Sequence, residues 1–215
     1  MRLLVISDQH NSEQGLAYAL KLVRTQTPDL IIHLGDIISS RPASFLRETL
    51  RKLAATNRPV LVVPGNNDPR ENLRDIPETG AILLHESVYK HADLRFVGRG
   101  ASNRTPFHTP FEEEDSVLAG TIADIVEPGD IWCFHAPVYG FRDMVEKGIH
   151  TGVHSYWDLW NQTRPWVVLS GHIHDDFGMD FYKGTYFINP GALQNMRAAI
   201  VDLERNNVCV SFLTE

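Results

Sequence analysis

The sequence predicts an α/β (α+β) fold, a four-layer αββα sandwich in which two mixed β-sheets pack face to face with helices outside. Two observations lead to this prediction. Apolar strands alternate with amphipathic helices in residues 3–63, which is the pattern of a parallel sheet. Short strands with polar turns follow in residues 81–100, and further strands come after the last helix, so a second sheet is needed to hold them.

Composition favours one domain in a water-soluble protein. With 215 residues, 43% of them hydrophobic, the chain is long enough for one well-filled core, and we expect residues 1–215 to form a single domain. A net charge of −7 without a run of Lys and Arg argues against a general grip on nucleic acid or anionic lipid. Cys133 and Cys209 are too few for a disulfide scaffold. With no signal-peptide pattern and no apolar run that could span a bilayer, we expect a cytoplasmic protein without a membrane partner.

Residues 3–63 have the pattern of a β-α-β-α-β unit. Apolar residues recur at helical spacing in residues 11–25 and 42–55, which predicts two crossover helices. Asn11 followed by Gln14 resembles an N-terminal capping arrangement for the first helix. The three strands are expected at residues 3–7, 30–34 and 60–63.

Short strands and loops dominate the middle of the chain. Gly, Ser, Asn, Thr and Pro are frequent in residues 99–111, which predicts a long loop, and the acidic residues 112–115 indicate the first turn of a helix over residues 112–126. We interpret the long segment 136–151 as a flap on the substrate side. An antiparallel sheet is expected from strands at residues 82–84, 88–90 and 94–97. Further elements are expected at residues 131–134 (strand), 155–162 (helix), 166–170, 185–188, 198–203 and 208–213 (strands).

Five of the predicted strands end in Asp, His or Asn. Loops after the carboxyl ends of strands in an α/β sheet gather at one edge, so residues distant in sequence can meet there. Each motif is weak taken singly, but their order is informative. The motifs are Asp8-Gln9-His10, Gly35-Asp36, Gly65-Asn66-Asn67-Asp68, His135 and Gly171-His172-Ile173-His174.

Structural interpretations suffice for the other histidines and for the cysteine near this set. His33 interrupts a buried strand and is expected to be a hydrogen-bonded core residue. His85, His91 and His108 are expected to be ordinary surface or loop residues. Cys133 is better explained as a small buried hydrophobe than as a nucleophile.

Taken in order, the five motifs resemble the signature of the calcineurin-like metallophosphoesterases, over residues 3–191. The segments 134–140, 148–152 and 189–191 resemble more closely the small single-domain prokaryotic phosphodiesterase-like members and the metallophosphoesterase-domain proteins of animals. The resemblance implies a double sheet flanked by helices and a metal-dependent phosphoesterase. It also implies that a hydroxide held between two metal ions attacks phosphorus, without a covalent protein intermediate.

The resemblance implies two divalent metal ions, and the side chains present suit them. Mixed oxygen and imidazole ligands accept Mn, which we expect first, and also Fe, Zn, Co or Ni. Asp36 is the natural bridging carboxylate. His172 and His174 are two residues apart, so an extended backbone points both imidazoles the same way. Asp8, His10, Asp36 and His174 are expected to hold one ion, and Asp36, Asn66, His135 and His172 the other.

The sequence departs from the common family pattern at Asn67, where Gly-Asn-His-Asp is expected. The missing histidine is usually assigned the protonation of the leaving group. Asn67 can donate a hydrogen bond to a phosphate oxygen, but its amide is no useful acid. His150, His154 or Arg142 on the flap could contact the substrate instead, and His150 is the first candidate.

The leading hypothesis is a phosphodiesterase that acts on a small or nucleotide-like ester. Three alternatives stay open: a phosphomonoesterase or protein phosphatase, a non-catalytic scaffold on the same fold, and a nuclease. Because the chain is acidic, long nucleic acid is not expected as a substrate without a partner. The sequence does not identify the native metals, the substrate or the pathway. It is compatible with a homo-oligomer as well as a monomer.

Overall fold

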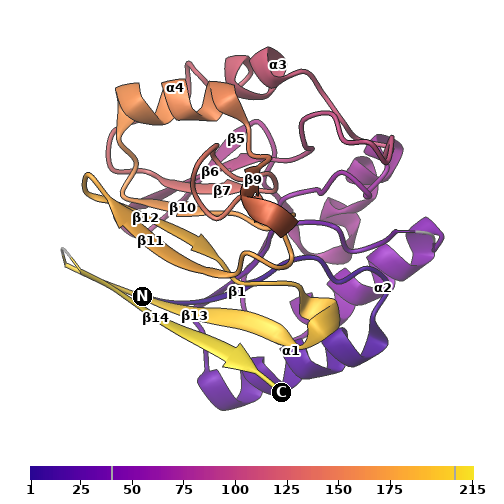
Figure 1. The fold of residues 1–215 in the computed structure, drawn as a ribbon. Helices are drawn as coiled ribbons and strands as arrows, with labels where there is room; N and C mark the ends of the chain where they lie inside the picture. The colour runs from indigo at the N-terminus through magenta and orange to yellow at the C-terminus, as the bar shows by residue number, and fades with distance from the viewer. Residues whose placement is uncertain (40, 206) are drawn as a thin grey trace.

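A computed structural model describes residues 1–39, 41–205 and 207–215, and they form two six-stranded mixed sheets with helices on their outer faces (Figure 1). This arrangement confirms the predicted fold class. In the first sheet β1 to β4 and β14 run in one direction, and β13 runs antiparallel to its neighbours β1 and β14. Its strand order is β14 (Asn207–Thr214), β13 (Arg197–Glu204), β1 (Arg2–Ile6), β2 (Leu30–His33), β3 (Val60–Val62) and β4 (Ile82–Leu83). The order in the second is β11 (Gly178–Tyr182), β12 (Thr185–Asn189), β10 (Val167–Leu169), β7 (Ile131–Phe134), β6 (Leu94–Arg99) and β5 (Ser87–His91).

Helices cover the outer face of each sheet. The helices α1 (Glu13–Gln26) and α2 (Ala43–Ala54) lie against the first sheet, and α3 (Asp115–Gly120) and α4 (His154–Thr163) lie against the second (Figure 1). Side chains point alternately to the two faces of a strand. One face of each sheet packs against the other sheet and the opposite face packs against helices, so both faces are buried. Leu30 and Ile131 belong to the apolar layer between the sheets, whereas Ile31 and Trp132 pack on the helix side.

Several local predictions need correction. Ser12, not Asn11, caps α1, and its side chain accepts a hydrogen bond from the N–H of Gly15 at 2.9 Å. Only β5 and β6 pair antiparallel in residues 81–100, because β4 joins the first sheet parallel to β3. The predicted helix over residues 112–126 shrinks to α3, since Glu112 binds threonines of the preceding loop and the poor helix formers Gly120 and Thr121 end it.

Three strands were not predicted from the sequence. Edge strand β11 is largely exposed and contains Gly and Asp, so its pattern is weak. The flap contains a short hairpin of β8 (Met144–Val145) and β9 (Ile149–His150). The 3-10 turns are η1 (Arg70–Asp75), η2 (Pro77–Thr79), η3 (Glu146–Gly148) and η4 (Leu193–Asn195). Within the described residues, every helix is too short or too polar to cross a membrane.

Candidate metal centre

Loops at the carboxyl ends of strands from both sheets are joined by hydrogen bonds. The N–H of Asp8 donates to the carbonyl of Gly35 at 2.9 Å, which links the loops after β1 and β2. The N–H of Gly171 donates to the carbonyl of His135 at 3.0 Å, which links the loops after β7 and β10. The N–H of His172 donates to Oδ2 of Asp8 at 3.0 Å and so connects the two sheets. The predicted motifs therefore meet at one edge.

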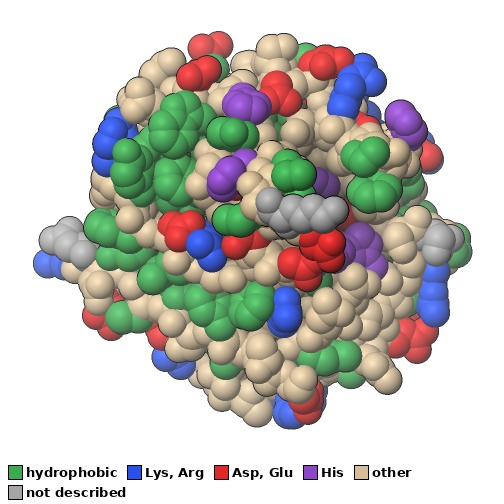
Figure 2. All heavy atoms as spheres, in the orientation of Figure 1, with side chains coloured by type: hydrophobic (Ala, Val, Ile, Leu, Met, Phe, Trp, Pro, Cys, Tyr) green, Lys and Arg blue, Asp and Glu red, His purple; other side chains and the backbone are tan. Residues whose placement is uncertain are grey.

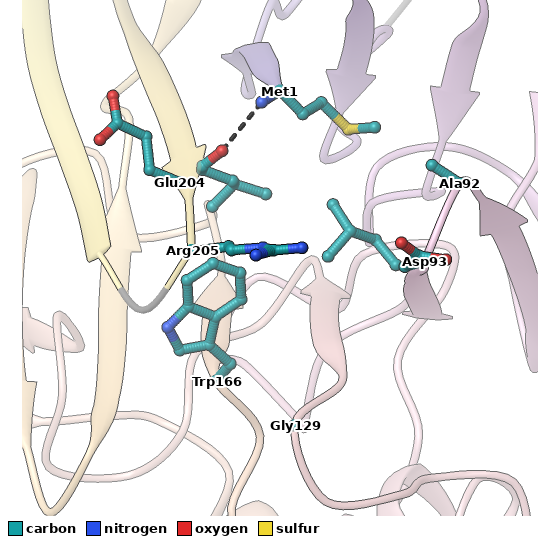
Figure 3. A pocket seen from close by; sticks show the side chains of 9 residues that line it. Met1, Ala92, Asp93, Gly129, Trp166, Glu204 and Arg205 are labelled. Atoms are coloured by element: carbon teal, nitrogen blue, oxygen red, sulfur yellow. Dashed lines mark hydrogen bonds between the residues drawn. The ribbon is translucent and has the colours of Figure 1, made fainter.

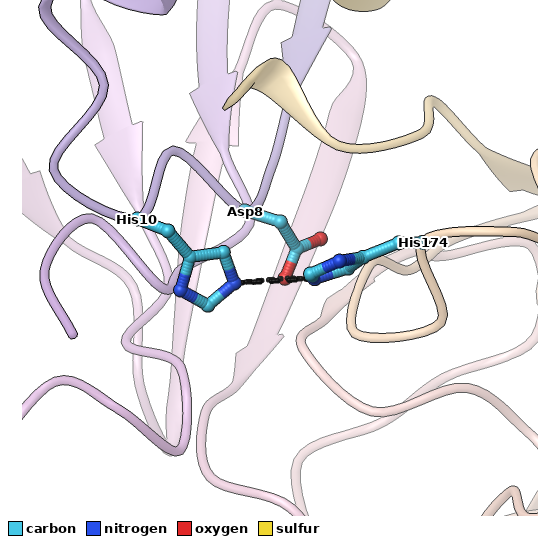
Figure 4. A group of neighbouring side chains, drawn as sticks. All are labelled: Asp8, His10 and His174. Atoms are coloured by element: carbon cyan, nitrogen blue, oxygen red, sulfur yellow. Dashed lines mark hydrogen bonds and ion pairs between the residues drawn. The ribbon is translucent and has the colours of Figure 1, made fainter. Parts of the chain in front are cut away.

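Asp8, His10 and His174 form the first group of polar side chains, and they point toward one another from two separate segments, the loops after β1 and β10 (Figure 4). Nε2 of His10 lies 3.1 Å from Nε2 of His174, and Oδ1 of Asp8 lies 3.4 Å from Nε2 of His174. This Oδ1 is buried and accepts no hydrogen bond from any described residue. A divalent ion would satisfy all three atoms at once, so this group fits a metal.

Asp36, His135 and His172 form the second group, with Asn66 beside them. Nδ1 of His135 lies 2.7 Å from the carbonyl of Leu34, which can only accept, so Nδ1 carries the proton and Nε2 offers a lone pair. That Nε2 faces Oδ1 of Asn66 at 2.8 Å and Oδ1 of Asp36 at 3.6 Å. Because these are three electron-rich atoms without a proton between them, the second group also fits a cation.

Asp36 lies between the two groups. Its Oδ2 is 3.6 Å from Nε2 of His10, and its Oδ1 is 3.6 Å from Nε2 of His135. The side chain is only 2% exposed. Burial, together with the charge of Asp8, raises the pKa of Asp36 to about 6, because both disfavour the ionised carboxylate. One carboxylate thus lies within reach of both groups, and its role as a bridge between two ions stays a prediction.

The protonation states suit metal binding. Burial lowers the pKa of His172 to about 3 and also lowers the pKa of His10 and of His135, so these rings are neutral at pH 7. Burial alone would raise the pKa of Asp8, but the close approach of His174 and the other nearby imidazoles outweigh it and lower that pKa. Divalent ions need ionised carboxylates and neutral imidazoles. At His174 the effect of burial is outweighed by the contact with Asp8, which raises the pKa of that ring, so an ion there competes with a proton.

The backbone at the candidate ligands is strained. Asp8, His10, Asp36 and His172 have φ values of 55°, 44°, 54° and 67°, in the left-handed region that non-glycine residues rarely adopt. Each such residue costs roughly 1–3 kcal/mol, and such strain clusters at functional sites. The hydrophobic core does not require this backbone conformation at the candidate ligands. The surrounding loops therefore hold these residues in place.

Two glycines let the loops after β2 and β3 approach each other. A Cβ atom on Gly35, whose φ is +102°, would lie 2.3 Å from the backbone N of Gly65. A Cβ atom on Gly65 would lie 2.0 Å from Oδ1 of Asp36. Real Cβ contacts are not this short, so both positions require glycine for the carboxylate to sit where it does.

Comparison with known proteins agrees with this geometry. The family model described as the calcineurin-like phosphoesterase superfamily domain matches residues 1–206. An uncharacterized protein of Methanocaldococcus jannaschii is 28% identical over 198 residues, which is 88% of each chain. The chain belongs to the calcineurin-like phosphoesterase superfamily. Members of this superfamily are metal-dependent hydrolases of phosphoester bonds.

Solved structures share the fold. Protein TT1561 of Thermus thermophilus has a TM-score of 0.76 at 18% identity, covering 98% of this chain and 97% of its own. A dimetal phosphatase from Danio rerio has a TM-score of 0.68 at 14% identity, covering 99% and 95%. An archaeal phosphodiesterase has a TM-score of 0.58 at 19% identity, covering 99% and 100%. At these identities the likeness concerns the fold alone.

Asn67, which replaces the expected histidine, binds the shared carboxylate. Its backbone N–H donates to Oδ1 of Asp36 at 2.8 Å, and its side-chain Nδ2 donates to Oδ2 at 2.7 Å. Within the superfamily site, Asn67 therefore orients Asp36. The predicted contact of Asn67 with a substrate phosphate stays a prediction.

His150 does not join the two groups. Its Nδ1 lies 2.5 Å from Oδ1 of the fully buried Asp143, which fixes the ring to the base of the flap. In the hairpin, Met144 pairs with His150 and Val145 with Ile149, so His150 and Val145 lie on opposite faces. Val145 lines the cavity beside the metal centre, and His150 is not among the residues that line it. The catalytic role of His150 stays a prediction that requires the flap to rearrange.

Supporting residues near the ligands were not assigned roles from the sequence. The buried carboxylate of Asp68 accepts hydrogen bonds from the N–H groups of Gly65 at 2.9 Å and Ile38 at 3.1 Å, which ties the loops after β2 and β3 together. Asn189 donates to the carbonyl of Ile173 at 2.7 Å and so supports the loop that carries the last two histidines. Asp68 belongs to the motif Gly65-Asn66-Asn67-Asp68, which was the available signal. The sequence indicated Asn189 first as part of a turn that could line the floor of the site.

Two other histidines are now placed. His33 is buried, its Nδ1 accepts the N–H of Gly35 at 3.2 Å, and burial lowers its pKa to about 3, so the core interpretation is confirmed. His85 lies in a loop, as expected, but its side chain is only 10% exposed. It accepts the N–H of Gly100 at 3.1 Å, so it is not an ordinary surface residue.

Proposed function

We propose that this protein is a phosphodiesterase that uses a dinuclear metal centre to hydrolyse small phosphoesters. One observation carries the proposal: the two oxygens of Asp36 face a histidine nitrogen of each group, both at 3.6 Å. A carboxylate shared in this way is the arrangement that two ions a few ångströms apart require. Asp8, His10 and His174 would hold one ion, and Asn66, His135 and His172 the other.

When bound, two divalent ions supply a nucleophile at neutral pH and offset the charge of the phosphate oxygens. Residues of the chain orient the side chains that would hold the ions. Asn67 holds both oxygens of Asp36 and so fixes the bridging carboxylate. The carbonyl of Leu34 holds His135 in the tautomer that leaves Nε2 free for an ion.

Asparagine at position 67 supports a preference for esters whose leaving group departs readily. Asn67 has no acidic proton, and its amide is engaged with Asp36, so it offers little help to a poor leaving group. An aryl diester needs less help than a serine or sugar monoester. The solved relatives include a phosphodiesterase and a phosphatase, so the fold itself serves both reactions.

The decisive experiment is metal analysis of the purified protein, followed by a panel of mono- and diesters with each metal restored. We expect two metal equivalents per chain and faster hydrolysis of diesters than of matched monoesters. A protein that binds two metals but hydrolyses only monoesters would be a phosphomonoesterase. A protein that binds metals and hydrolyses neither class would be a scaffold.

We also propose manganese as the native metal and the cytoplasm as the location, with residues 1–215 acting as one domain. The mixed carboxylate, amide and imidazole set supports manganese, although Fe, Zn, Co and Ni accept the same ligands. A homo-oligomer is compatible with this proposal. The net charge of −7 argues against long nucleic acid or a membrane surface as partner.

A further inference from the structure

A cavity of about 720 Å³ lies directly beside the metal centre. His172 and His174 form one side of it, and Pro106, Phe107 and Val145 line another. In the space-filling view, histidine and acidic side chains gather near the middle of the face shown, with hydrophobic side chains beside them (Figure 2). Cavities of roughly 300–1,000 Å³ hold organic ligands, so this one has room for far more than a phosphate group.

Phe107 is the most solvent-exposed large hydrophobic side chain in the part of the chain that is described, at 81%. Exposing an aromatic ring to water is unfavourable, by about 25 cal/mol for each Å² of apolar surface. A ring left open on the wall of a ligand cavity is therefore a candidate contact for the ligand. This is the first observation behind the inference.

The loop that carries Phe107 is anchored to the metal centre, which is the second observation. The carboxylate of Glu112 accepts hydrogen bonds from the hydroxyls of Thr105 at 2.6 Å and Thr109 at 2.7 Å. Oγ1 of Thr109 in turn accepts Nδ2 of Asn66, a candidate metal ligand, at 2.9 Å. The N–H of Phe107 donates to Oγ1 of Thr105 at 3.1 Å. The backbone that carries the exposed ring is thus fixed relative to Asn66.

The rest of the cavity wall favours a flat ring with polar edges over an aliphatic chain. Asn103, Thr105 and Thr151 also line the cavity, and Asn103 joins the loop to the flap by donating to the carbonyl of Thr151 at 3.1 Å. An aliphatic chain would take these polar groups out of water without replacing their hydrogen bonds, which is costly. A heteroaromatic ring can stack on Phe107 and still offer hydrogen-bonding atoms at its edge.

We propose that Phe107 is a specificity-determining residue that stacks on a planar aromatic substituent of the phosphoester. The proposal rests on the function proposed above. It identifies the preferred substrates as phosphodiesters in which the group that stays on phosphorus carries a flat, nucleobase-like ring. Pro106 and Val145 complete the apolar wall around that ring.

The test compares two diesters with the same leaving group, thymidine 5′-(p-nitrophenyl phosphate) and methyl p-nitrophenyl phosphate. Phe107→Ala should lower the ratio of their kcat/KM values by about 5- to 150-fold, the range measured for stacking a base on an aromatic side chain. Phe107→Trp should keep the ratio, and Phe107→Leu should behave like Phe107→Ala. If Phe107→Leu restores the ratio, the contact is apolar without stacking, and the aromatic assignment is wrong.

Phe181→Ala is the matched control, because Phe181 is 60% exposed on edge strand β11 and does not line the cavity. It should leave both kcat/KM values unchanged. A ratio that is equally unaffected by Phe107→Ala would overturn the stacking proposal while leaving the phosphodiesterase function intact.

A binding measurement separates the two proposals if no ester is hydrolysed. Calorimetry on the metal-loaded protein would compare thymidine 5′-monophosphate with methyl phosphate. Tighter binding of the nucleotide, lost in Phe107→Ala and kept in Phe181→Ala, supports the stacking role even if the catalytic proposal fails. Equal affinity of the wild-type protein for both ligands would overturn it.

Discussion

The two ends of the central strands each carry a cavity, but only one end carries convergent ligands. At the carboxyl ends, about 720 Å³ of space borders two groups of Asp and His side chains. At the amino ends, about 450 Å³ is lined by charged and aromatic residues that include Asp93, Trp166, Glu204 and Arg205 (Figure 3). Within the described residues, neither group of possible metal ligands includes a side chain of this second cavity. A cavity alone therefore does not identify the site; converging electron-rich atoms on a strained backbone do.

The largest effect is expected from Asp36→Asn, which removes the charge between the two groups. Activity should fall by more than about 10²-fold, and occupancy should fall at both metal positions, because even residues behind the ligands change metal affinity by roughly 10- to 100-fold. Metal analysis and kinetics on the same preparation measure both effects. Asp130→Asn is the matched control, since Asp130 is equally buried but precedes β7 and binds Arg95 at 2.8 Å.

The control should cost stability and spare metal content. If Asp36→Asn keeps two tightly bound metals and near-normal turnover, Asp36 is not the bridge. If Asp130→Asn loses metal as severely as Asp36→Asn, the contrast between the two ends fails.

A smaller and more selective effect is expected from His172→Ala and His174→Ala. Nε2 of His174 faces Asp8 and His10, whereas the ring of His172 packs edge-on against His135 with centroids 5.1 Å apart. Each variant should lose a different ion, with affinity lowered by about 10- to 100-fold or more. Anomalous scattering from crystals of each variant locates the remaining ion. Loss of the same ion from both would show that the division of ligands is wrong.

Asn67→His should change how the rate depends on the leaving group. Across a series of aryl diesters, the wild-type rate should fall steeply as the leaving-group pKa rises, because Asn67 is no acid. The imidazole should raise the slow end by roughly tenfold. This is less than the roughly 10² to 10⁴ that a well-placed acid contributes, since the change also removes the hydrogen bond to Asp36. A shallow wild-type dependence would mean that another acid, such as His150, already serves the reaction.

The sequence predicted that the side chains of the two groups would meet because each ligand motif lies in the loop after a buried strand. Asp36 and His135 come immediately after strong apolar runs, and parallel strands bring such positions to one edge whatever the loops do. The division of the ligands between two ions came from the family resemblance, and it stays a prediction.

The other features of the site depend on loop geometry, which periodic sequence patterns do not predict. His150 was selected for its chemistry, but the hairpin register places it opposite the cavity. Phe107 lies in a segment that the sequence predicted only as a long loop, so it was given no role. Its exposure follows from three hydrogen bonds that Thr105 and Thr109 of that loop donate to Glu112, which local sequence patterns do not encode.

Acid should weaken the ligand end through its buried neutral histidines. The pKa of His33 is about 3 in the folded protein because burial disfavours the charged ring, against about 6.5 in the unfolded chain. Below pH 6.5 the unfolded chain binds a proton that the folded protein does not, so this contribution to stability falls as pH drops toward 3, by about 1.4 kcal/mol per pH unit. Urea denaturation of the metal-free protein at pH 7 and pH 5 should show a shallower pH dependence for His33→Gln. An unchanged slope would mean that His33 is not the titrating group.

The smallest effect is expected from Arg205→Ala at the amino-end cavity, which Arg205 lines as an exposed side chain. Strand β1 has five residues, so the two ends are about 16 Å apart at about 3.3 Å per residue. A unit charge at that distance in water contributes only about 0.3 kcal/mol, and salt screens it further. The variant should therefore keep kcat/KM within about twofold and keep both metals, when assayed at low and physiological ionic strength. A tenfold loss of activity with both metals still bound would show that the amino-end cavity acts on the metal centre through the sheets. The contrast between the two ends would then describe two coupled sites and not one site and one surface hollow.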